Sequence, residues 1–276
     1  MKKVAIVACS NPRTILWKNQ KDKLIDFFKE NNYEVIMSKY IYESNNALDR
    51  SGEKRANELM NFFKDSKIEE IYDISGGDMA NEILDYIDFD IIKNSSATFW
   101  GYSDLTTIIN AIYTKINKPS VLYQVRNLID EEYKDILQKR FINRDKLFDL
   151  NYEFIQGSKI NGIVVGGNIR CFLKLSGTPY YPNMNNKVLV LESLGGQVPQ
   201  MITYLSQLKS QGVFNKINGI ILGTFTEMEK EKCSPDMVTL VKHFVPKDLP
   251  IVKTKEIGHN KDAKAIWIGK EILIEK

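Results

Sequence analysis

Ser103 stands where a strand pattern gives way to a helix pattern. Residues 97–100 have the composition of a short buried strand, and apolar side chains then recur at helical spacing through residues 105–113. A sharp strand-to-helix turn exposes a serine hydroxyl, and the helix N-terminus favours negative charge beside it. Ser103 is therefore a candidate nucleophile for acyl transfer. A serine followed by Asp104 ahead of an apolar helix is equally typical of an ordinary N-cap.

Two adjacent glycines are the second feature with a chemical interpretation. Gly76 and Gly77 follow the strand expected at residues 68–74, and sequential strands are usually neighbours in a sheet. In that arrangement the backbone amides of Gly77 and Asp104 would hold the oxyanion of a tetrahedral intermediate. The alternatives are a phosphate-binding turn or a purely structural one, and no Walker A lysine or complete dinucleotide glycine pattern accompanies the pair.

Histidine is the usual general base for a serine nucleophile because its pKa lies near neutrality. The chain has only two histidines. His243 lies inside an amphipathic helix pattern at residues 236–245 and is interpreted as a packing or surface residue. His259 lies in a polar loop after the strand expected at residues 251–253, and loops at strand ends commonly display reactive side chains. His259 is therefore the predicted base.

A carboxylate is the third group that such a site requires, because it orients the imidazole and stabilises its charged form. Glu192 ends the apolar run at residues 188–191, immediately ahead of a segment that contains Gly195 and Gly196. An acid at the carboxyl end of a buried strand suits this role. The alternative is a strand end that is simply solvated.

The elements that must position these residues follow an α/β pattern in the first half of the chain. Four apolar runs read as parallel strands: residues 4–8, 33–37, 68–74 and 97–100. Four helix patterns lie between or after them: residues 21–30, residues 51–64, a helix carrying Ile83, Leu84 and Ile87, and residues 105–113. This alternation predicts a parallel sheet with helices on its faces.

The second half begins after a polar stretch at residues 130–151, where no strand pattern survives. We therefore expect two domains, residues 1–140 with the serine turn and residues 141–276 with Glu192 and His259. Further strands are expected at residues 162–167, 188–192 and 217–223, with a helix at residues 200–211. A tight hairpin is expected from residues 265–268 and 271–274, joined by Gly269 and Lys270.

Composition excludes several classes of protein. The 276 residues are 43% hydrophobic and 26% charged, which is ordinary for a globular protein. A net charge of +3 without a basic block argues against a nucleic-acid partner. Because no apolar run approaches the roughly 20 residues of a membrane helix and no signal segment is recognisable, a cytoplasmic location is expected. The cysteines have neither metal-ligand nor redox spacing, so no metal is expected: Cys9, Cys171 and Cys233.

Taken in order along the chain, these segments resemble the L,D-carboxypeptidase family of serine peptidases, which includes the microcin C self-immunity hydrolases. The resemblance covers most of the chain and rests on these segments: residues 76–77, 101–106, 166–168, 189–192 and 258–259. It implies that Ser103 is the nucleophile and that Glu192 and His259 complete its triad. It also implies an N-terminal Rossmann-like layer and a C-terminal α/β domain with a small, partly barrel-like sheet.

The resemblance further implies a homodimer without a cofactor. The implied substrate is a small peptide, a muropeptide stem from which a terminal D-alanine is released. Two segments depart from the family pattern, residues 122–127 after the nucleophile helix and residues 193–199 after Glu192. Both lie where substrate would be held.

A terminal carboxylate usually requires a cationic partner. Arg126 and Arg170 are the candidates, with Asn168 as a further substrate contact, although either arginine can equally be a surface ion-pair residue. One rival function is hydrolysis of aminoacyl or acyl-sulfamoyl nucleotides, for which Trp100 and Tyr123 would supply a stacking wall unless they pack in the core. A second rival is a binding protein that keeps the triad without using it.

Overall fold

In the part of the chain that the structure describes, two six-stranded sheets form the framework. The computed structural model describes residues 2–44 and 46–276. The first sheet has the order β11-β5-β4-β3-β1-β2 and the second β12-β7-β8-β9-β10-β6. The strands of the first sheet are β1 (Lys2–Val7), β2 (Tyr33–Met37), β3 (Ile68–Asp73), β4 (Thr98–Gly101), β5 (Ser120–Leu122) and β11 (Ile266–Ile268). Those of the second are β6 (Glu153–Gln156), β7 (Lys159–Asn168), β8 (Lys187–Ser193), β9 (Gly219–Phe225), β10 (Ile251–Lys253) and β12 (Glu271–Glu275).

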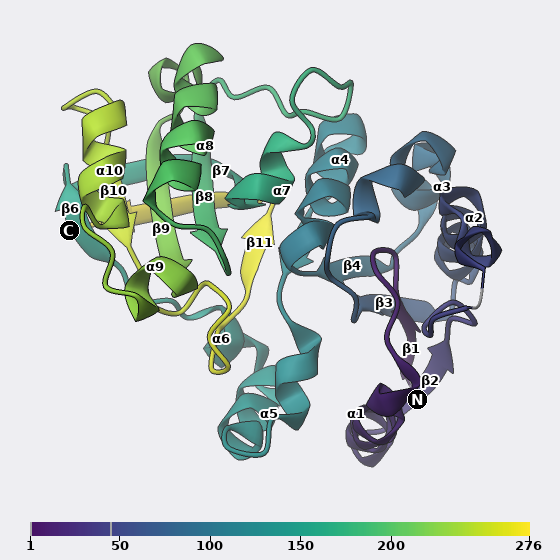
Figure 1. Ribbon diagram of the computed structural model, residues 1–276. Helices are drawn as coiled ribbons and strands as arrows, with labels where there is room; N and C mark the ends of the chain where they lie inside the picture. The colour runs from purple at the N-terminus through teal and green to yellow at the C-terminus, as the bar shows by residue number, and fades with distance from the viewer. Residues whose placement is uncertain (1, 45) are drawn as a thin grey trace.

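Helices cover both sheets (Figure 1). In chain order they are α1 (Lys18–Glu30), α2 (Gly52–Lys64), α3 (Phe89–Asn94), α4 (Thr106–Ile116), α5 (Lys134–Ile142), α6 (Arg144–Phe148), α7 (Ile169–Leu173), α8 (Val198–Ser210), α9 (Thr226–Lys230) and α10 (Met237–Phe244). Short 3-10 helices complete the chain: η1 (Ile15–Trp17), η2 (Ala47–Arg50), η3 (Ala80–Tyr86), η4 (Ser103–Leu105), η5 (Val125–Ile129) and η6 (Val213–Asn215).

The first sheet is buried on both faces, as its continuous apolar strands predict. Along β1, Val4 and Ile6 face one way and pack in a cluster with apolar residues of α1 and α5. Ala5 and Val7 face the other way, toward α2, η3 and α4. This alternation follows from the two-residue period of a strand. The apolar cluster that contains Ala5 and Val7 also contains Val164 of β7, in the other sheet. Helix α4 contacts both β4 and β7, so it lies between the two sheets.

The predicted α/β class is confirmed. Strands β1 to β5 run parallel, and β3 lies beside β4 as expected. The second sheet has a parallel centre from β7 to β10, with antiparallel edges at β12 and β6. It curls around its helices (Figure 1). In the described part of the chain, no helix combines the length and the apolar character needed to cross a bilayer.

The expected hairpin near residues 265–274 is wrong. Strand β11 pairs with β5 in the first sheet, whereas β12 pairs with β7 in the second. The Gly269 and Lys270 turn does not close on itself: Gly269 N–H donates to the Val164 carbonyl (2.8 Å), and the Lys270 carbonyl accepts from Val164 N–H (2.9 Å). Gly269 has φ +89°, and a Cβ there would lie 2.8 Å from the Tyr113 ring. The turn therefore carries the chain from one sheet to the other.

The helix expected after Gly77 is the 3-10 helix η3, whose Ile83 and Leu84 are buried as expected. The expected division into two domains at residue 140 stays a prediction. Strand β11 belongs to the first sheet although it comes from the second half of the sequence.

Candidate active site

Ser103 lies at a sharp bend between β4 and α4. Its φ is +56°, in the left-handed region that non-glycine residues seldom adopt, and Tyr102 before it is extended (φ −150°). The chain turns tightly here, since a Cβ on Gly101 would lie 2.6 Å from Leu105 Cβ. Ser103 is partly exposed, as expected of a hydroxyl displayed on such a turn.

Glu192 is fully buried at the end of β8 and accepts three hydrogen bonds. His259 Nδ1 lies 2.7 Å from Oε2, the Tyr102 hydroxyl donates to the same oxygen at 3.0 Å, and Asn168 Nδ2 donates to Oε1 at 3.1 Å. A carboxylate can only accept, so Nδ1 carries the imidazole proton and Nε2 is left free to accept one. Burial, followed by the charge of Glu192, raises the pKa of Tyr102 well above its usual value, so its phenol remains a donor.

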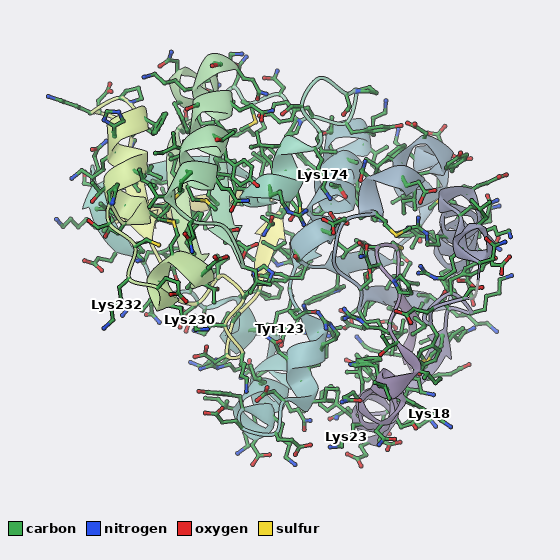
Figure 2. All side chains as sticks on the ribbon, in the orientation of Figure 1. Lys18, Lys23, Tyr123, Lys174, Lys230 and Lys232 are labelled. Atoms are coloured by element: carbon green, nitrogen blue, oxygen red, sulfur yellow. The ribbon has the colours of Figure 1, made fainter. Side chains whose placement is uncertain are left out.

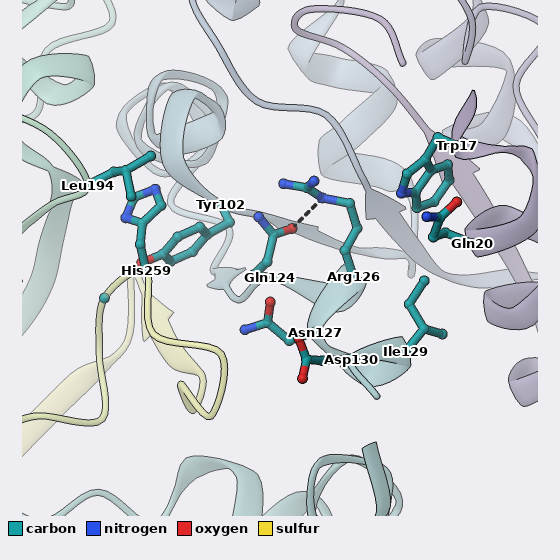
Figure 3. Close-up of a pocket in the computed structure, with 11 residues that line it drawn as sticks. Trp17, Gln20, Tyr102, Gln124, Arg126, Asn127, Ile129, Asp130, Leu194 and His259 are labelled. Atoms are coloured by element: carbon teal, nitrogen blue, oxygen red, sulfur yellow. Dashed lines mark hydrogen bonds between the residues drawn. The ribbon is translucent and has the colours of Figure 1, made fainter. Parts of the chain in front are cut away.

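His259 is placed against the bend by this contact network. Its ring packs edge-on against Tyr102, with centroids 4.8 Å apart, and Figure 3 shows the two side chains next to one another. Among the described residues, no hydrogen bond joins His259 to the Ser103 hydroxyl. Catalytic hydrogen bonds are often long before substrate binds. The structure thus brings Glu192 and His259 together beside the residue that precedes Ser103.

Gly77 and Asp104 lie at the carboxyl ends of neighbouring strands, β3 and β4. Gly77 has φ +115°, and a Cβ there would lie 2.6 Å from Asn11 Nδ2, so the turn requires glycine. Within residues 2–44 and 46–276, neither amide donates to another protein group. Two free backbone donors at adjacent strand ends can bind a developing negative charge.

A polar pocket of about 360 Å³ opens beside His259 (Figure 3). Its lining comprises Trp17, Gln20, Tyr102, Gln124, Arg126, Asn127, Ile129, Asp130, Leu194, Gly258 and His259. Arg126 Nε donates to Gln124 Oε1 at 3.1 Å, and no carboxylate in the described ranges lies within ion-pair distance of it. Burial, followed by the nearby cation of Arg13, lowers the pKa of Arg126 to about 9. An anionic ligand would relieve this cost of burying an unpaired cation.

The other two predicted substrate contacts are engaged with protein groups. Asn168 binds Glu192 and also accepts from Cys171 N–H at 3.3 Å, which caps α7. Arg170 pairs with Asp78 and donates to the Gly77 carbonyl at 2.8 Å. Neither residue lines the pocket, so their role in substrate binding stays a prediction.

Trp100 and Tyr123 pack in the core, at 2% and 1% exposure, and do not line the pocket. His243 is exposed on α10, in agreement with its interpretation as a packing or surface residue.

Sequence reasoning missed Trp17 and the hydroxyl of Tyr102. Trp17 reaches the pocket from η1, where no motif marks it. Tyr102 directly precedes Ser103, and that adjacency was an available signal. In the part of the chain described here, no three side chains of the metal-binding types cluster.

Comparison with known proteins gives two family matches. A model described as the LD-carboxypeptidase N-terminal domain matches residues 4–123, and one described as the LD-carboxypeptidase C-terminal domain matches residues 161–274. A relative named "Probable murein peptide carboxypeptidase", from Bacillus subtilis (strain 168), is 25% identical over 96% of this chain and 86% of its own length. The microcin C7 self-immunity protein of Escherichia coli is 21% identical over 99% of this chain and 90% of its own length.

Solved structures show the same fold. The microcin C7 self-immunity protein has a TM-score of 0.85 at 20% identity, with 100% of this chain and 96% of that chain covered. A muramoyltetrapeptide carboxypeptidase from Oxalobacter formigenes has a TM-score of 0.80 at 18% identity, with 99% and 95% covered. Other structures of the self-immunity protein hold glutamyl sulfamoyl guanosine or aspartyl sulfamoyl adenosine.

Proposed function

This chain belongs to the LD-carboxypeptidase family, and we propose that it is a serine peptidase that releases a terminal D-amino acid from a muropeptide stem. The observation that carries the proposal is the 2.7 Å contact between Glu192 and His259, held against the bend at Ser103. We extend the proposal, on the family resemblance, to a homodimer that recycles peptidoglycan fragments in the cytoplasm.

In the proposed reaction, His259 Nε2 takes the proton of the Ser103 hydroxyl as its oxygen attacks the substrate carbonyl. Glu192 holds the Nδ1 proton and stabilises the imidazolium that forms. The amides of Gly77 and Asp104 donate to the oxyanion. The imidazolium then protonates the departing amine, and the C–N bond breaks to leave an acyl-enzyme. Water attacks this ester with His259 again as base, which regenerates Ser103.

The pocket supports a substrate that ends in a free carboxylate. Arg126 faces that pocket as a half-buried cation, and no described residue lies within ion-pair distance of it. A guanidinium binds a carboxylate with two parallel hydrogen bonds. The D-amino acid that leaves would therefore sit with its carboxylate at Arg126 and its amine toward His259.

Incubation of the protein with a muropeptide that ends in D-alanine tests the reaction, with chromatographic detection of released D-alanine. We expect turnover by the wild type and none by Ser103→Ala, whose fold is checked by circular dichroism. A fluorophosphonate should form an adduct on Ser103. Absence of both D-alanine release and adduct in folded wild-type protein would refute the hydrolase assignment and favour a binding protein.

Arg126 is tested with a matched pair of substrates, one with a terminal carboxylate and one with a carboxamide. Hydrogen bonds to charged groups contribute about 1.5–3 kcal/mol, so Arg126→Gln should lower kcat/KM for the carboxylate by roughly 10- to 100-fold. The carboxamide should be affected little. Arg140→Gln is the control, since Arg140 donates to the Asp262 carbonyl at 3.2 Å and does not line the pocket. Equal losses on both substrates would contradict a carboxylate contact.

A second substrate class has support from one feature of the pocket. Trp17 lines the wall next to Arg126 (Figure 3), and an indole face can stack on a nucleobase. Related structures hold aminoacyl sulfamoyl nucleosides. Aminoacyl sulfamoyl adenosine therefore belongs in the substrate panel, and Trp17→Ala should impair its hydrolysis more than that of the muropeptide.

A further inference from the structure

We propose that Lys174 is a positioning residue for the turn that supplies the Gly77 amide. This inference rests on the proposed hydrolase function and assigns a residue that acts through others, without touching substrate. Lys174 follows α7 and reaches the first half of the protein. Figure 2 shows Lys174 near α7 and α4, two helices that contact each other.

Lys174 binds two groups of the first half at once. Its Nζ lies 2.5 Å from Asp104 Oδ1 and donates to the Asp78 carbonyl at 2.9 Å. The Asp104 carboxylate has no exposed surface, and the Lys174 side chain is 20% exposed. Asp104 Oδ2 accepts from the Ser10 hydroxyl at 2.6 Å and from Ala80 N–H at 2.8 Å. Among the described residues, Lys174 is the cation within ion-pair distance of this buried carboxylate.

The turn from Gly77 to Ala80 is held by hydrogen bonds to the backbone groups around the Gly77 amide, the proposed oxyanion donor. Three amides donate to side chains: Asp78 to Asn11 (2.9 Å), Met79 to Ser10 (3.3 Å) and Ala80 to Asp104 (2.8 Å). Two carbonyls accept from the other half: that of Gly77 from Arg170 (2.8 Å) and that of Asp78 from Lys174 (2.9 Å). The Gly77 amide is left without a partner in the described chain. Donors fixed in advance stabilise a transition state because they need not reorganise.

Lys174 matters more to this turn than Arg170 does. In the ion pair between Arg170 and Asp78 the two side chains are 43% and 63% exposed. Exposed ion pairs contribute little to stability. Removal of Lys174 leaves the buried Asp104 carboxylate without its cation, which is costly inside a protein. The Asp104 carboxylate would then shift toward other partners, and the hydrogen bonds of the Ala80 amide and the Asp78 carbonyl that depend on this arrangement would loosen.

Lys174→Met tests the inference, because it keeps the length of the side chain and removes the charge. The matched control is Lys3→Met. Lys3 pairs with Asp65 at 2.7 Å, with side chains 15% and 32% exposed. It lies at the amino end of β1, whereas the Gly77 turn follows the carboxyl end of the parallel neighbouring strand β3. For each variant, kcat and KM on the muropeptide, the rate of Ser103 labelling by a fluorophosphonate, and urea stability are measured.

We expect Lys174→Met to lower kcat and the labelling rate by about 10- to 100-fold, less than the roughly 100- to 1,000-fold loss of a whole oxyanion donor. KM should change less than about threefold, because the turn acts on the transition state. Lys3→Met should leave both rates unchanged even where its stability falls. Equal kcat in Lys174→Met and wild type, or an equal fall in Lys3→Met, would overturn the inference.

Two outcomes separate this inference from the proposed function. Wild type that neither labels nor turns over removes both, whereas an active wild type with an equally active Lys174→Met removes only the role of Lys174. Should Lys174→Met fail to fold, Lys174→Arg keeps the cation for Asp104 but has a different reach. It should retain wild-type stability and lose about threefold to tenfold in kcat, and an unchanged kcat would count against positioning.

Discussion

Glu192→Gln is the substitution that most directly examines the proposed chemistry. Glu192 receives donors on both oxygens, from His259 and Tyr102 on one and from Asn168 on the other. Glutamine has the same shape but carries an amide N–H₂ in place of one oxygen. Whichever way the amide is turned, its N–H₂ group faces another hydrogen-bond donor. If the N–H₂ faces His259, Nδ1 must accept and the proton moves to Nε2, where it blocks proton transfer from Ser103.

The magnitude follows from the charge that is lost. An imidazolium and a carboxylate in a contact of 2.7 Å have charge centres about 4 Å apart, which corresponds to about 4 kcal/mol at an effective dielectric constant of about 20. Removal of this interaction from the transition state lowers kcat by roughly 1,000-fold. Substrate binding does not use the imidazolium, so KM should stay within about threefold.

The assay is D-alanine release under steady-state conditions, with urea unfolding to show that the variant is folded. Glu256→Gln is the control, because Glu256 lies in the same loop as His259 but binds Asn151 and Lys264. We expect control activity near that of wild type. A Glu192→Gln enzyme with more than about a tenth of wild-type kcat would show that the carboxylate does not stabilise a catalytic imidazolium.

Three smaller perturbations follow from the same contacts. Tyr102→Phe removes one donor from Glu192 and should lower kcat by roughly tenfold or more without loss of fold, as measured by D-alanine release. Ser103 has φ +56°, so the inactive Ser103→Gly should be about 1 kcal/mol more stable to urea than Ser103→Ala, and equal stability would argue against backbone strain. A hydrogen bond from Arg170 lowers the pKa of Asp78 below its usual 3.8. The small stability that this exposed pair contributes is therefore present above about pH 4 and lost as the pH falls through the lower folded pKa. The urea stability of wild type should exceed that of Asp78→Asn slightly at about pH 7, and the two should converge at pH values below the folded pKa.

The sequence predicts the parallel strands and their helices because buried strands and amphipathic helices leave strong periodic patterns. The pattern after Ser103 indicates α4 for this reason. The hairpin prediction at Gly269 fails because a glycine turn between two short apolar runs looks the same whether the runs pair with each other or enter different sheets. The deciding contacts, those of Gly269 and Lys270 with Val164, are more than a hundred residues distant in sequence.

The site shows the same limit. Glu192 and His259 can be selected because strand ends and polar loops display functional groups, and histidines are scarce in this chain. Lys174 cannot be selected in this way, since a lysine after a short helix is typical of any solvated surface. Arg170 and Arg126 look alike in sequence, yet one pairs with Asp78 and the other faces the pocket.

Strand β11 has a consequence for how the protein is made. It covers the edge of β5, yet it is synthesised after nearly all of the second sheet. While the chain is still on the ribosome, β5 therefore presents unpaired backbone groups, the kind of edge at which proteins associate wrongly. Such late, distant pairing also slows folding. We expect the first half, expressed by itself, to aggregate instead of behaving as an independent unit.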